Sequence, residues 1–366
     1  MSANGERSKL RVAIWGAGGV ARCLIRECLR RPEVEIVGVY ARSREKDGRD
    51  AGVIYGDEPA GVLITTDKEA IYQARPDVLL HVPRTSDVDF GSEILEDIKR
   101  FLRGGTSVIS SAAYHYPTYS SSAVVRALEE ACREGKAAIH ATGINPGLLC
   151  ERWVVGLTAG MTTISSIKVQ ELADVAAIPS LGMLQSIGIG ATPESLLNKS
   201  GSRYFGEAVS GACERIGYKV ERVEHSCVGI AAKQQISLPL MTIEPGQNAA
   251  IIHQYIGIVD ERPFFTLEEY MFVDPAACPI SLDGAPYVAT ATIEAEPTSV
   301  AMRVALQASI VENRGLRTDG TRPTYNTTAA AMLNAIPYVL EATPGIVYAR
   351  AFGVHRPDLR IKPIVQ

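Results

Sequence analysis

The sequence predicts an α/β protein in two parts: an N-terminal doubly wound parallel sheet, and a second α+β domain that contains a mostly antiparallel sheet. Over residues 1–146, short apolar runs alternate with segments whose apolar residues recur at helical spacing, as in a parallel sheet covered by helices. Over residues 147–320, strand-like segments of alternating polarity follow one another with longer turns. Residues 321–366 are expected to form a C-terminal helix and strand.

Length and composition exclude several classes of protein. The 366 residues are 46% apolar and 21% charged, which is typical of a globular protein long enough for two domains. The net charge of −4 and the lack of a basic block argue against a nucleic-acid partner. The chain has no apolar run of about 18 residues, no apolar signal segment at its start and no C-x-x-C pair among its seven cysteines. We therefore expect a cytoplasmic protein with reduced thiols and no membrane partner.

The first part is expected to alternate strand and helix from its first apolar run. Residues 11–15 are predicted to form a buried strand, and residues 20–29 an amphipathic helix. Arg22, Arg26 and Arg30 fall on the opposite stripe of this helix, which we expect to face solvent. The other predicted elements of this part are strands at 34–40, 77–82, 106–111 and 136–141, and helices at 90–102 and 124–132.

The second part is expected to be rich in strands. A helix over residues 148–159 follows a glycine-rich turn, and another helix over 202–216 lies between strand-like segments. Residues 287–296 alternate in polarity, as a half-exposed antiparallel strand does. The remaining segments are predicted to form strands at 165–171, 219–227, 248–258 and 264–273, helices at 300–312 and 324–338, and a last strand at 346–350.

A glycine-rich turn between the first strand and the first helix indicates a dinucleotide site. Residues 16–21 have the pattern G-x-G-x-x-A: Gly16 permits a tight turn, Gly18 lets a pyrophosphate approach the backbone, and Ala21 lets the helix pack closely. The helix N-terminus then presents N–H groups and a positive dipole end to the phosphates. This context predicts a Rossmann fold, with a simple tight turn as the alternative. The cofactor-binding candidates are Gly16, Gly18, Gly19, Val20 and Ala21.

The end of the second predicted strand indicates which dinucleotide is bound. An NAD-binding protein would place an Asp or Glu there to accept a hydrogen bond from the ribose 2′-hydroxyl. This chain instead has Arg42 and Ser43, which can hydrogen-bond a 2′-phosphate, and Arg44 and Lys46, which can add positive charge. We therefore expect NADP(H) as cofactor, with NAD(H) as the alternative cofactor and a solvated charged loop as the alternative interpretation.

Further ligand-binding segments are expected where strands end, because doubly wound sheets bind ligands beyond the carboxyl ends of their strands. One such segment is predicted to run under the nicotinamide ring, and a later glycine-rich turn carries an amide side chain suited to the carboxamide or to capping a helix. The six histidines have neither an H-x-x-x-H pair nor a cysteine at metal-ligand spacing, so we expect no metal site. The cofactor candidates in these segments are Val82, Pro83, Asn145, Pro146 and Gly147.

Several segments together resemble a known family. They are residues 16–21, 38–52, 141–147, 171–174 and 330–345. The chain resembles the dihydrodipicolinate-reductase-like NAD(P)-dependent oxidoreductases, most closely the branch of 2,4-diaminopentanoate dehydrogenase and the native amine dehydrogenases. The resemblance implies hydride transfer to a C=N or C=O carbon, a second domain that carries the substrate contacts and the interface of a homodimer, and a C-terminal segment that returns to the Rossmann domain.

The chain departs from the family pattern in two places. It lacks the His-His pair with a following Lys and the Asp-Ala-Pro-Ser-Gly-Thr stretch of true dihydrodipicolinate reductases, which disfavours that substrate. The amine-dehydrogenase branch carries a glutamate shortly before its Tyr-Pro, where it helps ammonia add to a ketone. Counting back three residues from Tyr116 gives Ala113 here, and this departure argues against reductive amination with free ammonia.

Hydride addition produces an alkoxide or an amine that needs a proton, and a His or Tyr near the nicotinamide can supply it. The candidates are Tyr114, His115 and Tyr116, with packing in the core as the alternative for each. Strand alternation would point His115 away from both tyrosines. Glu171 in the second domain is expected either to bind a cationic substrate amine or to cap a helix. His140 is expected to be a hydrogen-bonded core residue.

These observations lead to one predicted function and two alternatives. The first is an NADPH-dependent oxidoreductase that reduces a small or medium imine or ketone, in the manner of an imine reductase or amine dehydrogenase. The second is a ketone or aldehyde reductase that does not use ammonia, which Ala113 favours. The third is a sensor that binds NADP(H) without turnover.

Overall fold

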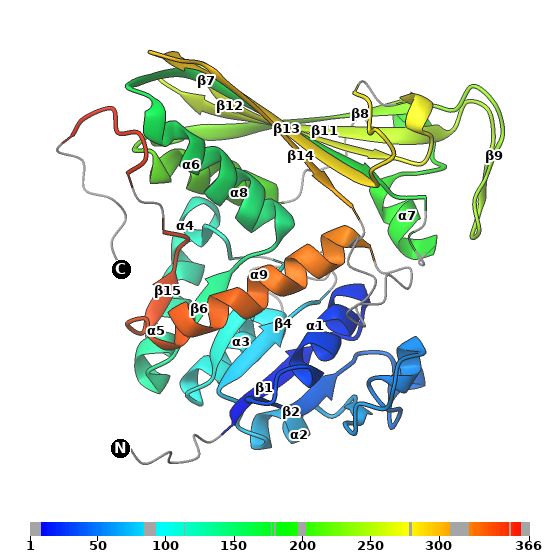
Figure 1. Ribbon diagram of the computed structural model, residues 1–366, viewed down its shortest axis with the longest axis vertical. Helices are drawn as coiled ribbons and strands as arrows, with labels where there is room; N and C mark the ends of the chain where they lie inside the picture. Colours follow the sequence, from blue (N-terminus) through cyan, green and yellow to red (C-terminus); the bar gives the residue numbers. More distant parts are fainter. Residues whose placement is uncertain are drawn as a thin grey trace. The chain divides into compact units, whose positions relative to one another are not determined.

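The computed structural model describes residues 9–83, 93–112, 114–176, 178, 181–196, 203–277, 280–307, 322–350 and 353–359. The chain forms two compact units (Figure 1). The first contains residues 1–148 and 319–349, and the second contains residues 149–318 and 350–365. The predicted C-terminal segment is therefore divided between the two units.

The first unit is built on a seven-stranded sheet in the order β15-β6-β5-β4-β1-β2-β3. All neighbouring strands pair in parallel, so the prediction of a parallel, Rossmann-like sheet is confirmed. Of the strands in this sheet, the two-residue strand β3 is the one that the sequence pattern did not predict. The strands are β1 (Leu10–Trp15), β2 (Val34–Tyr40), β3 (Ile64–Thr65), β4 (Val78–His81), β5 (Ser107–Ser110), β6 (Ala138–Ala141) and β15 (Gly345–Val347).

Helices cover both faces of this sheet, as expected for a doubly wound fold (Figure 1). On one face α1 and α9 bury residues such as Leu24 and Met332, and on the other face α2, α3 and α5 bury residues such as Ile98 and Leu128. No helix in the described part of the chain combines the length and the apolar character needed to cross a bilayer. The helices are α1 (Gly19–Leu29), α2 (Lys68–Gln73), α3 (Glu93–Arg103), α4 (Pro117–Ser120), α5 (Ser122–Gly135) and α9 (Pro323–Leu340).

The connection between β2 and β3 is a long loop that one aspartate holds together. The Asp50 carboxylate accepts hydrogen bonds from the backbone N–H groups of Gly52, Val53, Ala60 and Gly61, at 2.7–3.1 Å. These donors, Ala60 first, hold the pKa of the Asp50 carboxyl below its ordinary value. The loop therefore has a defined shape although it contains only two short 3₁₀ turns in its described residues, at Arg44–Lys46 and Val53–Tyr55.

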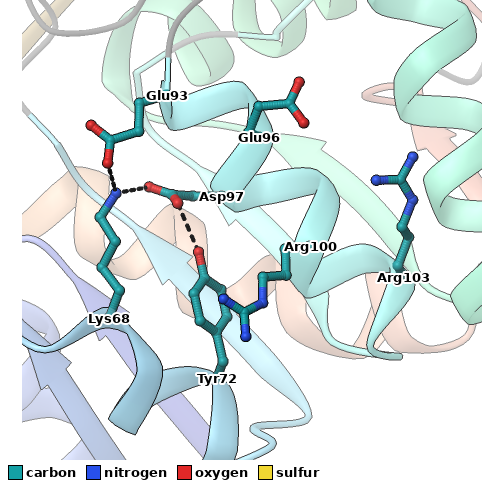
Figure 2. Close-up of a pocket in the computed structure, with 7 residues that line it drawn as sticks. All are labelled: Lys68, Tyr72, Glu93, Glu96, Asp97, Arg100 and Arg103. Atoms are coloured by element: carbon teal, nitrogen blue, oxygen red, sulfur yellow. Dashed lines mark hydrogen bonds and ion pairs between the residues drawn. The ribbon is translucent and has the colours of Figure 1, made fainter.

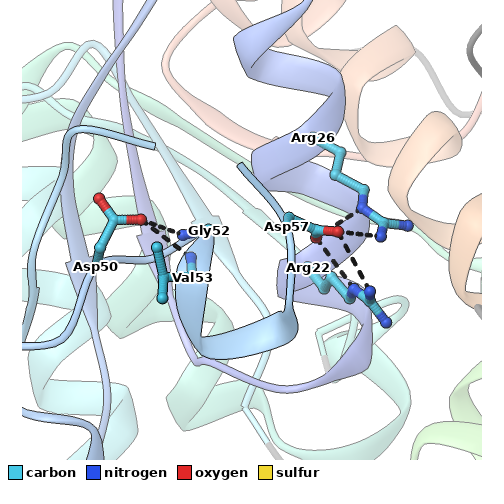
Figure 3. Close-up of polar contacts among 6 residues, drawn as sticks. All are labelled: Arg22, Arg26, Asp50, Gly52, Val53 and Asp57. Atoms are coloured by element: carbon cyan, nitrogen blue, oxygen red, sulfur yellow. Dashed lines mark hydrogen bonds and ion pairs between the residues drawn. The ribbon is translucent and has the colours of Figure 1, made fainter. Parts of the chain in front are cut away.

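This loop covers part of α1 (Figure 3). The Asp57 carboxylate accepts a hydrogen bond from Arg22 Nε at 3.1 Å and another from Arg26 Nε at 2.8 Å. The three side chains are only 16–20% exposed. The prediction that the whole basic stripe of α1 faces solvent is therefore wrong, and of its three arginines Arg30 is the exposed one. Helical periodicity places these arginines on one stripe but contains no information about a loop that packs over it.

A buried polar pair joins the carboxyl ends of β4 and β5. His81 Nδ1 lies 3.0 Å from Ser110 Oγ, and the same oxygen accepts the N–H of Ala112 at 3.3 Å. Burial lowers the pKa of His81 to about 3, so its imidazole is neutral at physiological pH. On β6, His140 is also buried, with Nδ1 2.6 Å from the carbonyl of Val347, which confirms it as a hydrogen-bonded core histidine.

The second unit is built on a six-stranded mixed sheet in the order β14-β13-β7-β12-β11-β8. Only β7 and β12 pair in parallel among the paired strands described, so the prediction of a mostly antiparallel sheet is confirmed. The helix α8 packs on one face, where Val209 lies over Gly257 of β11. The elements are β7 (Thr163–Asp174), β8 (Arg222–Ala231), β9 (Ile236–Ser237), β10 (Thr242–Ile243), β11 (Asn248–Val259), β12 (Arg262–Phe272), β13 (Tyr287–Glu296), β14 (Val300–Leu306), α6 (Val155–Leu157), α7 (Leu181–Ile187) and α8 (Arg203–Arg215).

The helix predicted over residues 300–312 is wrong, because residues 300–306 form the edge strand β14. This strand pairs antiparallel with β13, its even-numbered residues half-buried and its odd-numbered residues exposed. Ala, Met, Arg and Leu each favour a helix, but the period of two in side-chain burial matches a strand. The rest of the predicted helix, from residue 308, lies outside the described residues.

The buried His81 predicts a pH dependence of stability. An unfolded histidine has a pKa near 6.5, so below that pH the unfolded chain binds a proton that folded His81 does not bind until about pH 3. Stability is therefore lost as the pH falls. Between pH 7 and pH 5 the wild type should lose about 2 kcal/mol more unfolding free energy than His81→Gln.

Urea denaturation at the two pH values measures this difference. Tryptophan fluorescence in a Trp153→Phe background reports on the first unit, because Trp15 then remains as its fluorophore. An identical loss of stability in His81→Gln and the parent would contradict the assignment.

Candidate functional site

The turn between β1 and α1 has the shape of a phosphate cradle. Gly16 has a φ of +124°, and a Cβ at this position would overlap the carbonyl oxygen of Val82, so only glycine fits. Among the described residues, no atom lies within 4 Å of the place that a Cβ on Gly18 would take, so the backbone before α1 is open. Ala21 is fully buried against the sheet, and the first turn of α1 contains no acidic residue. The turn therefore fits the pyrophosphate of a dinucleotide.

The other predicted cofactor residues of this region lie around the cradle. Val20 is half-buried and packs on the core of the α1 face, while Val82 is buried and Pro83 half-buried directly after β4. Gly19 is required for packing within the protein, because a Cβ there would overlap the aromatic ring of Tyr325 in α9. Sequence reasoning missed this contact.

The predicted 2′-phosphate cluster lies directly after β2. Arg42, Ser43 and Arg44 are exposed, and Lys46 Nζ donates a hydrogen bond to the carbonyl of Ala17 within the glycine turn. Burial, and then the charge of Arg49, lowers the pKa of Lys46. The hydrogen bond from Lys46 therefore places the cationic loop next to the phosphate cradle.

The predicted carboxamide turn follows β6. Gly147 has a φ of +125°, and a Cβ there would lie 3.0 Å from Thr142 Oγ1 and 3.1 Å from the Thr142 Cα, so this position also requires glycine. The Asn145–Pro146 peptide bond is cis, and Asn145 is half-buried. The helical conformation begins after these three residues, which agrees with the helix predicted from residue 148.

The three candidate proton donors lie in the segment that follows β5. Tyr114 and His115 are buried, whereas Tyr116 is half-buried and its ring lies 5.5 Å from that of Tyr348. Tyr114 has a φ of +70°, so the strand alternation expected past β5 does not hold. A non-glycine residue in this region costs on the order of 1 kcal/mol, and such strain is concentrated at functional sites. Ala113, three residues before Tyr116, lies outside the described residues.

Glu171 lies in the second unit, three residues before the end of β7. This position excludes the alternative that it caps a helix. It is 7% exposed, and its direct neighbour on β12 is Glu269, 3% exposed, so two buried carboxylates lie on the same face of the sheet. Burial, and then the charge of Glu171, raises the pKa of the buried Tyr287 on β13 well above its ordinary value. Sequence reasoning missed Glu269 and Tyr287, although an acidic pair inside an apolar strand was a usable signal.

More buried polar groups lie close to these carboxylates. Burial, and then the charges of Glu269 and Glu151, raises the pKa of the Cys150 thiol well above its ordinary value, so this thiol stays protonated. Glu151 forms an ion pair with Arg215 at 3.4 Å, with both side chains almost fully buried. Such a pair contributes little net stability, because both charges are removed from water. The interior of the second unit is therefore polar and acidic at this place.

An open hollow of about 430 Å³ lies elsewhere on the first unit, between α2 and α3 (Figure 2). Its polar side chains pair with one another. Lys68 forms ion pairs with Glu93 and with Asp97, the latter at 2.6 Å, and the Tyr72 hydroxyl donates a hydrogen bond to Asp97 at 2.8 Å. Arg100 lies 3.8 Å above the Tyr72 ring. None of the predicted site residues lines this hollow, which we interpret as a surface ion-pair network. Across the described residues, no three His, Cys, Asp or Glu side chains are arranged to hold a metal ion.

Comparisons with known proteins identify relatives that match most of the chain. An amine dehydrogenase of Streptomyces virginiae is 26% identical over 348 residues, which cover 91% of this chain and 93% of that protein. A 2,4-diaminopentanoate dehydrogenase of Acetoanaerobium sticklandii is 24% identical over 283 residues, covering 73% of this chain and 77% of that protein. The structure of an amine dehydrogenase from Mycobacterium smegmatis has a TM-score of 0.73, with 21% identity over 93% of this chain and 95% of that one.

A family model decides the membership of the chain. The model of the 2,4-diaminopentanoate dehydrogenase C-terminal domain matches residues 148–357, more than half of the 366 residues. The match covers β7 to β14 and α9, and so reaches from the second unit into the C-terminal helix of the first. The resemblance inferred from the sequence motifs is thus confirmed, and the chain belongs to the 2,4-diaminopentanoate dehydrogenase C-terminal domain family.

Proposed function

We propose that this protein is an NADPH-dependent oxidoreductase that transfers a hydride to the C=N or C=O carbon of a small or medium organic substrate. The observation that carries the proposal is the glycine turn before α1. At Gly16 the carbonyl of Val82 leaves no room for a side chain, whereas the space beside Gly18 is empty of described atoms and can take a phosphate. Family membership and relatives named amine dehydrogenase and 2,4-diaminopentanoate dehydrogenase support a substrate with a C–N bond.

The residues of the first unit bind and orient the cofactor. The bound nicotinamide supplies the hydride. The first N–H groups of α1 have no acceptor within the helix, so they are available to the phosphates beside Gly18. Arg42 and Ser43, exposed directly after β2, are assigned to hydrogen bonds with the 2′-phosphate, with Arg44 adding charge. Asn145 is assigned to a hydrogen bond with the carboxamide of the nicotinamide.

The proton that completes the reduction is assigned to the segment after β5. Tyr116 is the most accessible of the three candidates, while Tyr114 and His115 are buried. The positive φ of Tyr114 redirects the chain at the carboxyl edge of the sheet, where ligands of such folds bind. This segment is where we place proton donation.

The second unit is assigned to the substrate. Glu171 and Glu269, buried side by side, provide negative charge that suits the cationic amine of a substrate or product. Tyr287, which stays protonated beside them, can donate a hydrogen bond through its hydroxyl.

A ketone or aldehyde reductase that does not use ammonia is the second candidate. The observation in its favour is Ala113, because the resemblance to the amine-dehydrogenase branch implies a carboxylate at this position. Without a carboxylate there, ammonia would have no base to assist its addition to the carbonyl carbon.

A ketone panel separates these two candidates. NADPH oxidation is followed by absorbance with and without ammonium, at one pH and ionic strength, with sodium chloride as the matched salt. For an imine-reducing enzyme we expect oxidation that requires ammonium or a preformed imine. Equal rates with both salts would establish the carbonyl reductase instead.

Arg42→Glu tests the choice of cofactor. A hydrogen bond to a charged group contributes about 1.5–3 kcal/mol, so the ratio of kcat/KM for NADPH to that for NADH should fall at least about tenfold. Arg30→Glu makes the same change of charge at an exposed residue beyond the end of α1 and should leave this ratio unchanged. An unchanged ratio in Arg42→Glu would remove Arg42 from the 2′-phosphate site.

Single substitutions test the proton donor. Tyr114→Phe, His115→Asn and Tyr116→Phe each remove one candidate, and loss of the true donor should lower kcat about 10²-fold or more. The Kd for NADPH should stay unchanged. Tyr119→Phe in α4, an exposed tyrosine of the same segment, is the matched control. Wild-type kcat in all three variants would exclude this segment as the proton source.

A further inference from the structure

The helix α9 touches both of the turns that line the proposed cofactor site. The aromatic ring of Tyr325 in this helix fills the space that a side chain on Gly19 would take. The ring carbon that bears the hydroxyl lies 3.3 Å from where the Cβ of such a side chain would be. One turn later, Thr328 lies 3.6 Å from the corresponding position on Gly143, before the carboxamide turn. Residues three apart share one face of a helix, so a single face of α9 lines the site from one turn to the other.

The ring edge of Tyr325 that includes the carbon bearing the hydroxyl lies beside the first residue of α1. Gly19 is the first residue of that helix, and the N–H groups of its first turn have no acceptor within the helix. The ring is half-buried, and its hydroxyl has no hydrogen-bond partner among the residues that the structure describes. A phosphate that accepts hydrogen bonds from this turn therefore meets a phenol donor at its side.

The electrostatic surroundings favour an anion at this place. The first turns of α1 and α9, both within the described residues, contain no acidic side chain. The guanidinium of Arg322, at the N-cap of α9, lies 5.9 Å from the centre of the Tyr325 ring. A neutral donor with a cation near its ring thus lies next to Gly19, on a segment of the chain that the glycine-turn motif does not include.

We propose that Tyr325 is a phosphate-binding residue, whose hydroxyl donates a hydrogen bond to the dinucleotide pyrophosphate held by the first turn of α1. The inference rests on the proposed function and adds a residue from the C-terminal segment to it. Because the pyrophosphate is common to both dinucleotides, Tyr325 contributes to affinity for NADPH and NADH alike, whereas Arg42 discriminates between them.

Two Tyr→Phe variants of the same helix test the proposal. Tyr325→Phe removes only the hydroxyl and keeps the ring that packs on Gly19, so we expect an unchanged thermal unfolding temperature. Tyr338→Phe is the matched control, because Tyr338 is 71% exposed near the end of α9. Isothermal titration calorimetry on the full chain gives the Kd of NADPH, NADH and ADP-ribose for each protein.

We expect Tyr325→Phe to raise the Kd of all three ligands by about tenfold or more and Tyr338→Phe to change none of them. An unchanged Kd in Tyr325→Phe would show that the ring only packs against Gly19. A rise confined to NADPH would assign the hydroxyl to the 2′-phosphate. Either result overturns the proposal. A wild-type protein that binds neither dinucleotide overturns the proposed function itself, and that result is obtained before any variant is measured.

Discussion

One close approach of backbone to backbone determines the geometry of the first unit. Gly16 directly follows β1, its N–H donates to the carbonyl of Tyr40 at the end of β2, and its Cα lies against the carbonyl of Val82 beyond the end of β4. A side chain at Gly16 would push these strand ends apart. The glycine turn, the loop after β2 and the segment after β4 all begin here, so this contact brings three groups of predicted cofactor residues to one edge of the sheet.

Patterns between sequence neighbours are sufficient to predict most of the fold. The strands at 34–40 and 287–296 have their predicted bounds, because apolar runs and alternation depend only on adjacent residues. The glycine turn is predictable for the same reason. The edge strand β14 is not, since its residue types favour a helix and its pairing with β13 depends on residues outside the segment.

The parts of the site that the sequence did not predict are contacts between distant residues. Asp57 reaches Arg22 and Arg26, and Tyr325 takes the place of a side chain on Gly19, but no local spacing relates these positions. The neighbours Glu171 and Glu269 meet only because of the register between β7 and β12. A single sequence contains periodicity and short motifs, whereas these contacts follow from the assembled tertiary structure.

The two units bury polar groups of different kinds, in keeping with the separate roles proposed for them. In the first unit the buried His81 is neutral, so it joins two strand ends without placing a charge beside the proposed cofactor site. In the second unit Glu171 and Glu269 lie side by side in the interior. Removing carboxylates from water costs more than an ion pair generally returns, and apolar side chains would give a more stable sheet. Two carboxylates side by side are suited to a ligand of opposite charge, and under the proposed function that ligand is the cationic amine of the substrate.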